Sequence, residues 1–105
     1  MRDIEEFPDN FIQKLHMQIG QNVKKARENA NITQLQLSQL IGHKSVTIIS
    51  RAEICYKNQH FNIEHLAKIA FVLEVDICQL LGNKWFIYML SNKILENKRK
   101  ILIHL

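Results

Sequence analysis

The fold is decided by residues 33–53, which read TQLQLSQLIGHKSVTIISRAE. Thr33 is a favourable N-cap, and Gln36, three residues later, completes the capping box that opens a helix. Gly42 stops this helix, because glycine readily takes the left-handed backbone with which many helices end. The first part of the stretch therefore predicts a short helix from Gln34 to Ile41.

The second part of the stretch opens at Lys44 or Ser45 and runs to Ile54. Its β-branched run, residues 46–49, would suit a strand by propensity alone. Too few residues lie between Gly42 and the flanking helices for a strand to find a partner, so we expect a second helix. The residues of this helix that are available to the core are Ile48, Ile49 and Ala52.

A long helix is expected before this stretch. Asp9 or Asn10 can cap it. Gly20 weakens its middle by about 1 kcal/mol relative to alanine, which allows two helices that meet there. The apolar positions of this segment follow one helical face and are Phe11, Leu15, Ile19, Val23, Ala26 and Ala30.

Two further helices are expected after the stretch. Asn62 caps the first of them, and Asp76 caps a last turn that Gly82 closes. Cys78 lies in this apolar last turn and is expected to be a small core residue. The apolar stripe of the helix after Asn62 consists of Ile63, Leu66, Ile69, Ala70 and Leu73, and the last turn contains Ile77, Leu80 and Leu81.

The expected helices divide the chain into three parts. Residues 1–18 form an N-terminal extension that is partly helical, residues 19–82 form a compact five-helix domain, and residues 83–105 form a C-terminal tail. Only three Gly and one Pro occur in the chain, which argues against an all-β sandwich or barrel. The predicted fold class is therefore all-α.

Composition and charge limit the class of protein. The 105 residues suit one domain, and 47% hydrophobic residues exclude a disordered chain. The net charge of +4 divides into −2 for residues 1–18, +2 for residues 19–81 and +4 for residues 83–105. A basic chain weakly favours a polyanionic partner, although an ordinary solvated surface fits the charge equally well.

The sequence gives no signal for a membrane, a metal or an enzyme. No apolar run reaches the roughly 18 residues of a membrane span, and residues 1–6 do not resemble a secretory signal, so we expect a cytoplasmic protein without membrane contact. Cys55 and Cys78 lack zinc spacing, and His60 and His65 fall on different helical faces. Since phosphate loops and serine elbows are also missing, we expect no metal, no cofactor and no catalysis.

Residues 33–53 thus form a helix, a tight glycine turn and a second helix. In such a unit the first helix braces the second, which can enter the major groove of DNA. With the segments around it, the unit resembles the Cro/phage-repressor type of helix-turn-helix domain, the XRE family. The matching pieces are, in order, Val23 to Arg27, Ile32 to Gln34, Leu37, Ile41-Gly42, Ile49 to Glu53, Leu66 to Ala70, Leu73 to Asp76 and Leu80-Leu81.

The resemblance implies a domain of five helices that binds double-stranded DNA as a homodimer on an inverted-repeat operator, usually as a transcriptional repressor. Two other functions fit the same fold. One is the antitoxin of a toxin–antitoxin pair, which would bind a toxin through the C-terminal tail and repress its own operon. The other is a protein-interaction module that keeps the fold but does not bind DNA.

The resemblance also implies roles for individual residues. Arg27 and Glu53 fall where the family pairs an arginine with a glutamate to brace two helices. Base contacts are implied, within one position of register, for Lys44, Ser45, Val46, Thr47 and Arg51. Phosphate contacts are implied for Arg27, Thr33 and Gln34, and the polar loop after the second helix adds Tyr56, Lys57 and Asn58.

Simpler roles remain open for several of these residues. Ser45 and Thr47 also suit a plain helix cap, Val46 can contact a thymine methyl or pack inward, and Arg51 can reach a base or a phosphate. The sequence departs from the family pattern at three places. Residues 42–53 are one residue longer than the commonest spacing, Cys55 stands where a glycine is often found, and Ser38 replaces a small apolar residue.

Residues 83–105 hold more apolar residues than a small domain needs for cover. A helical stripe with a gap at Lys98 would consist of Ile87, Leu90, Ile94, Ile101 and Leu105, whereas residues 85–90 and 101–105 are apolar runs that also suit strands. We expect this tail to be a dimerisation element. The alternatives are that it covers the core of its own domain, or that Lys98, Arg99 and Lys100 add a phosphate contact.

Overall fold

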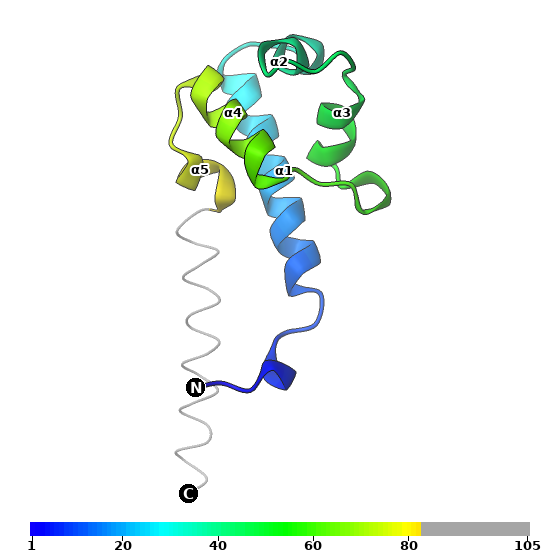
Figure 1. Ribbon diagram of the computed structural model, residues 1–105, viewed down its shortest axis with the longest axis vertical. Coiled ribbons are helices and arrows are strands. Elements are labelled where there is room, and N and C mark those ends of the chain that lie inside the picture. The colour runs from blue at the N-terminus through cyan, green and yellow to red at the C-terminus, as the bar shows by residue number, and fades with distance from the viewer. Residues whose placement is uncertain (83–105) are drawn as a thin grey trace, which may run out of the picture.

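The longest element is α1 (Phe11–Asn29), and the other helices are arranged around its C-terminal half (Figure 1). The computed structural model describes residues 1–82. Within them α3, α4 and α5 pack against α1, while α2 packs against α3. The remaining elements are η1 (Ile4–Glu6), α2 (Gln34–Leu40), α3 (Thr47–Glu53), η2 (Tyr56–Asn58), α4 (Ile63–Leu73) and α5 (Ile77–Leu81).

The all-α, five-helix prediction is confirmed for the described residues, since residues 1–82 contain five α-helices and two 3-10 turns but no strand. No helix in this part of the chain has the length and apolar character that crossing a membrane requires. The predicted dimerisation and toxin-binding role of residues 83–105, and the question of helix or strand there, lie outside the described residues.

Three of the helix starts follow the predicted N-caps. Thr33 Oγ1 accepts a hydrogen bond from Gln36 N at 3.1 Å, and Gln36 Oε1 accepts one from Thr33 N at 2.8 Å, so the predicted capping box is present. Asp76 accepts from Cys78 N at 2.9 Å. Each such cap typically stabilises a helix by about 1 kcal/mol, which matters for helices as short as α2 and α5.

The third cap is a second capping box, at the start of α4, with an unusual residue in it. Asn62 Oδ1 accepts from His65 N at 2.7 Å, and the ring atom Nδ1 of His65 accepts from Asn62 N at 3.1 Å. A histidine therefore does here what Gln36 does at the start of α2. Only an unprotonated Nδ1 can accept this bond.

The hydrophobic core lies where α1, α3, α4 and α5 meet. Its side chains come from all five α-helices and from the segment before α4. Detaching any one helix would therefore expose apolar surface to water. The buried hydrophobic residues are Ile19, Val23, Ala26, Leu37, Ile41, Ile49, Ala52, Phe61, Leu66, Ile69, Ala70 and Leu80.

Gly20 brings α1 and α3 close together rather than breaking α1. The helix is continuous from Phe11 to Asn29, so the two-helix alternative is wrong. A Cβ at Gly20 would lie 2.5 Å from Glu53 O and 2.8 Å from Ala52 O, closer than real Cβ atoms approach. Glycine therefore allows the backbone of α3 to lie directly against α1.

Some predicted boundaries and burials are wrong. α3 begins at Thr47, two to three residues later than predicted. Asn10 makes no side-chain cap and has a left-handed backbone with φ of 63°. Ile63 is 71% exposed because it is the first residue of α4 and points away from the core. Cys78 is exposed rather than part of the core, since its short helix turns Leu80 inward instead.

Two smaller predictions also differ from the structure. α2 ends at Leu40, and Ile41 is its C-cap with a buried side chain. Ala30 is exposed at the C-cap of α1, beyond the last turn that packs on the core. In both cases the apolar spacing continues past the end of the helix. Periodicity alone therefore does not show where the helix ends.

Candidate nucleic-acid interface

Helix α3 turns one face to the core and the other to solvent. Ile49 and Ala52 are fully buried, and α3 packs against both α1 and α2. Thr47 and Arg51 are exposed, and because they are four residues apart they share one face of the helix. This outer face is the part of the helix-turn-helix unit that a ligand would meet.

A buried ion pair fixes the C-terminal end of α3. Arg27 Nε donates to Glu53 Oε2 at 2.9 Å, and Arg27 Nη2 donates to Glu53 Oε1 at 3.1 Å. Arg27 is 8% exposed and Glu53 3% exposed. The hydrogen bonding of Arg27 to the Glu53 carboxylate is the largest cause that raises the pKa of Arg27 above its ordinary value. A bidentate bond of this kind sets both the distance and the orientation of α3 relative to α1, so α3 is held rigidly against α1.

Two more groups complete this network. Arg27 Nη1 donates to Ile32 O at 2.9 Å, and Gln34 Nε2 donates to Glu53 Oε1 at 2.9 Å. The carboxylate of Glu53 thus links α1, α2 and α3. Both Arg27 and Gln34 have implied phosphate roles, and in the structure both direct donors toward protein acceptors in this network.

The start of α3 carries a local polar arrangement. Ser45 Oγ accepts from Thr47 N at 3.2 Å and donates to Thr47 Oγ1 at 2.8 Å. Val46, the N-cap itself, makes no side-chain cap bond and is half-buried. Ser45 therefore provides the cap from one position earlier, while Lys44, Ser45 and Thr47 all remain exposed.

An aromatic ring lies beside two cations at the other end of α3. The guanidinium carbon of Arg51 lies 5.5 Å from the centroid of the Tyr56 ring, and Lys57 Nζ lies 5.4 Å from the same centroid. The face of an aromatic ring attracts cations, so Tyr56 orients both side chains. A cluster of Arg51, Tyr56 and Lys57 results, which joins α3 to the loop after it.

The backbone of this loop is strained. Cys55, Lys57 and Asn58 have φ values of 52°, 49° and 61°, in the left-handed region. A residue with a Cβ costs roughly 1–2 kcal/mol there. The strain at Cys55 falls at the position where glycine is often found in the family that the sequence resembles. Burial raises the pKa of the Cys55 thiol, whose Sγ donates weakly to Ala52 O at 3.8 Å.

The exposed Lys, Arg, Asp and Glu side chains of residues 29–63, which include α2, α3 and the loop, are all positive. Residues 29–63 contain three cationic residues, Lys44, Arg51 and Lys57, and one carboxylate, that of Glu53. The three cations are exposed, whereas the carboxylate is buried and paired with Arg27. A phosphate approaching this surface would therefore meet positive charge and no exposed carboxylate from these residues.

The structure brings some of the predicted site residues together, and the side chains of others bond within the protein. Arg51, Tyr56 and Lys57 are in contact, Ser45 contacts Thr47, and Asn58 is exposed in the same loop. Thr33 is exposed but its hydroxyl is used in the capping box of α2. Arg27 and Glu53 form the bracing pair that the resemblance implies, and Gln34 donates to the same carboxylate.

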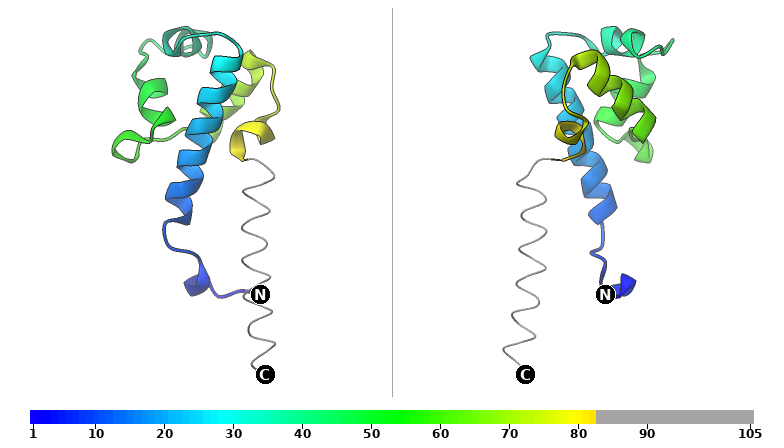
Figure 2. Two further views of the ribbon diagram at one scale, coloured as in Figure 1. Left: turned by 180° about the vertical axis from the view of Figure 1, so that it is seen from behind. Right: turned by 60° about the vertical axis from the view of Figure 1, so that its left-hand side comes forward.

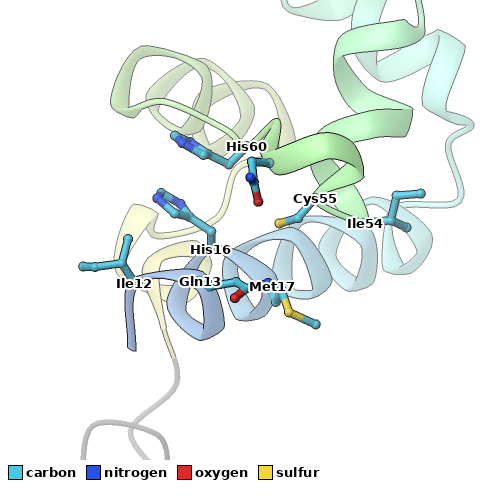
Figure 3. A pocket seen from close by; sticks show the side chains of 8 residues that line it. Ile12, Gln13, His16, Met17, Ile54, Cys55 and His60 are labelled. Carbon is cyan, nitrogen blue, oxygen red and sulfur yellow. The ribbon is translucent and has the colours of Figure 1, made fainter. Parts of the chain in front are cut away.

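A cavity of about 480 Å³ lies between the first half of α1 and the loop after α3 (Figure 3). The rings of His16 and His60 stack there, with centroids 3.6 Å apart and planes inclined by 10°. His16 Nδ1 is buried without a hydrogen-bond partner. Burial, and then the charge of His60, lower the pKa of His16. The other lining residues are Ile12, Gln13, Met17, Ile54, Cys55 and Asn58.

Sequence reasoning missed this histidine pair and the function of Gly20. His16 and His60 are far apart in the chain and share no motif, so no spacing could connect them. Their rings lie in nearly parallel planes rather than around one point, and within residues 1–82 no group of three or more His, Cys, Asp or Glu could hold a metal ion. For Gly20, the available signal was a glycine inside an otherwise regular helical stripe.

Comparison of the chain with protein-family models, with curated proteins and with solved structures gives no match. The resemblance to the XRE family therefore depends only on the ordered residues quoted above.

Proposed function

We propose that this protein is a sequence-specific DNA-binding transcriptional regulator that represses by occupying an inverted-repeat operator as a homodimer. The observation that carries the proposal is the outer surface of α3 and its loop, where Lys44, Arg51 and Lys57 are exposed and residues 29–63 add no exposed carboxylate. An α-helix fits the major groove, and cations beside it suit the phosphates that flank the groove.

The bracing network supports the same proposal. A helix that reads bases has to keep its orientation while phosphate contacts pull on its neighbours. Glu53, held by Arg27 and Gln34, fixes the end of α3 to α1 and α2 through hydrogen bonds of 2.9 to 3.1 Å. The contacting side chains then lie on a rigid support, which lowers the entropy lost on binding.

Selection from a pool of random DNA duplexes tests the proposal. We expect enrichment of inverted repeats whose half-sites lie about one helical turn apart, because a two-fold dimer presents two copies of α3. Affinity should fall steeply between low and moderate salt as cations on the protein replace the counterions of DNA. A pool without enrichment at any salt concentration contradicts the proposal.

A single substitution then separates base contact from phosphate contact. Arg51→Ala should cost about 1–3 kcal/mol of binding free energy and relax the preference at one base position if Arg51 reads a base. An equal loss on all sequences assigns Arg51 to phosphate. Lys68→Ala is the matched control, because Lys68 is an exposed cation on α4, ion-paired to Glu64 at 2.9 Å, and should leave affinity unchanged.

A protein-binding module is the second candidate. It is favoured by the exposed apolar residues Ile12, Met17 and Ile54 that line the cavity between α1 and the loop. The two candidates differ in the selection experiment, since a module that only binds protein enriches no DNA sequence. They also differ in the effect of replacing Arg51. In a module that binds protein through the cavity, this replacement should leave the binding of the protein partner unchanged.

A further inference from the structure

Helix α4 carries an exposed apolar stripe along its outer side. Ile63, Ala67 and Phe71 follow one another in steps of four residues, so their side chains form one continuous ridge on the helix. Ile63 is 71% exposed, Phe71 is 83% exposed, and Ala67 between them is exposed as well. These three residues, Ile63, Ala67 and Phe71, are called the α4 stripe below.

The α4 stripe is separate from the core face of the same helix. α4 packs against α1 and α5, and the residues that it buries are Leu66, Ile69 and Ala70. In Figure 1 α4 lies in front of α1, and in the left view of Figure 2, from behind, α1 lies in front of α4. The stripe therefore faces outward, and among residues 1–82 its two large side chains stay open to solvent.

A charged pair borders the stripe on the side away from the core. Glu64 and Lys68 directly follow Ile63 and Ala67, so at about 100° per residue they lie beside the ridge. Lys68 Nζ lies 2.9 Å from Glu64 Oε1, and both side chains are exposed. The outer side of α4 thus combines an apolar ridge with one acidic and one basic position along a single flank.

This surface is complementary to a second copy of itself. When two α4 helices pack antiparallel, Phe71 of one copy meets Ile63 of the other, and the small Ala67 lets the helix axes approach closely. The same arrangement brings the two charged flanks together, with Glu64 of one copy opposite Lys68 of the other. A parallel arrangement puts the flanks on opposite sides of the helix pair, where the charges do not meet.

The match of shape and charge favours a second copy over an unrelated partner, because a two-fold contact requires one patch that is complementary to itself. Its size also indicates its strength. One face of an 11-residue helix against its copy buries less than the roughly 1,200 Å² at which standard interfaces begin. We therefore expect a dimer that forms at high protein concentration and dissociates on dilution.

We propose that α4 is a homodimer contact, in which the α4 stripes of two copies pack antiparallel and Glu64 of each copy pairs with Lys68 of the other. The proposal goes beyond the proposed function, since it assigns a partner to α4 rather than to the surface of α3. It is tested without DNA, so a failure of the DNA selection and a failure of the dimer contact are separate results.

Sedimentation of the full-length chain over a range of concentrations tests the contact. The unaltered protein should shift from monomer to dimer as its concentration rises, and Phe71→Ser should raise the dissociation constant about tenfold or more. Serine and phenylalanine have similar helix propensity and the ring is exposed in the single chain, so thermal unfolding should be unchanged. Leu35→Ser on α2 is the matched control, because it removes a 50% exposed leucine outside the stripe and should not alter dimerisation.

Charge reversal tests the antiparallel orientation without changing the stripe. Lys68→Glu gives each copy a flank with two carboxylates, and Glu64→Lys gives a flank with two ammonium groups. Each variant alone should therefore dimerise several-fold more weakly, whereas a one-to-one mixture of the two variants should recover the dimer. Lys68→Ala should leave the dissociation constant nearly unchanged, since a neutral side chain removes a small attraction without adding repulsion.

Three results would overturn the proposal. The first is an unaltered chain that sediments as a monomer even at millimolar concentration. The second is a dimer whose dissociation constant is unaffected by Phe71→Ser, which would place the contact in another part of the chain. The third is equal dimerisation of the two charge variants alone and mixed, which would exclude the antiparallel pairing of Glu64 with Lys68.

Discussion

The two halves of α1 hold the α3 region in different ways. In the C-terminal half, Gly20 lets the backbones of α1 and α3 meet, and Arg27 binds Glu53 through two hydrogen bonds. In the N-terminal half, the contact is a stack of His16 on His60 beside a cavity, with a strained residue, Cys55, in its wall. One end of the contact is tight and fully paired, whereas the other has an unpaired buried nitrogen and open space.

This difference indicates which part of the protein is rigid. The tight end fixes the helix that the proposed function uses, and its hydrogen bonds satisfy every charged atom involved in the pair. The loose end fixes only the loop that carries Tyr56 and Lys57. We therefore expect substitutions at the tight end to destabilise the whole domain, and substitutions at the loose end to have smaller effects that depend on pH or backbone strain.

Glu53→Gln should have the largest effect. It leaves the buried charge of Arg27 without its counterion, and breaking a buried pair in this way costs about 3 kcal/mol or more. Urea denaturation followed by circular dichroism measures the loss. Glu28→Gln is the matched control, because Glu28 lies 4.0 Å from the same guanidinium but is exposed, so that its replacement should change stability by less than about 0.5 kcal/mol. Equal effects of the two variants would contradict the bracing role.

Gly20→Ala should come next. The added Cβ would lie within 2.8 Å of two backbone oxygens of α3, and backbone atoms cannot move aside as a flexible side chain can. Overpacking of this kind costs roughly 1–3 kcal/mol, part of which the better helix propensity of alanine offsets. Since α3 must shift, DNA affinity should fall as well. Gln21→Ala, at an exposed position of the same turn, should leave both quantities unchanged.

The sequence allowed the helices and their caps to be predicted because the signals are local. Thr33, Asn62 and Asp76 each act on backbone within three residues, and the apolar spacing of α4 follows from one helix alone. The all-α class and the capping boxes depend on such information. The start of α3 was harder to place, since Ser45 caps Thr47 N and the helix begins at Thr47, two residues after its capping side chain.

Contacts between distant segments were not accessible in the same way. Gly20 could be explained only once α3 was known to lie against it, and the stack of His16 on His60 joins residues that no motif connects. Likewise, the hydrogen bond from Gln34 to Glu53 depends on how α2 packs against α3. In each case the deciding neighbour comes from tertiary packing, which propensity and periodicity do not encode.

Cys55→Gly should stabilise the loose end. Cys55 has φ of 52° and ψ of 41°, a backbone that glycine adopts without the steric cost of a Cβ. The gain should be about 0.5–1 kcal/mol, because the greater freedom of glycine in the unfolded chain offsets part of the relief. Cys78→Gly provides the opposite control. It lies inside α5, where glycine should destabilise by roughly 1 kcal/mol. A loss of stability in both variants would show that strain at Cys55 is unimportant.

The smallest expected effect is a dependence of stability on pH, and it separates the two histidines with lowered pKa. For His16 the causes are burial and then the charge of His60. For His65 they are burial and then the charge of His43, partly opposed by Glu64. Below a pH of about 6.5 the unfolded state binds protons that these folded histidines resist, so stability should fall as the pH is lowered through that value and recover above it.

Two variants divide this pH dependence between the cavity and the cap of α4. In His16→Phe an aromatic ring still stacks on His60, but this ring cannot titrate. In His65→Gln a glutamine completes the capping box of α4, as Gln36 does in α2. Each should flatten part of the curve of unfolding free energy against pH between about 5 and 7.5. If His16→Phe leaves the curve unchanged, the stack at the loose end does not titrate with folding. The cap of α4 would then account for the acid sensitivity, and the comparison between the two halves of α1 would concern packing alone.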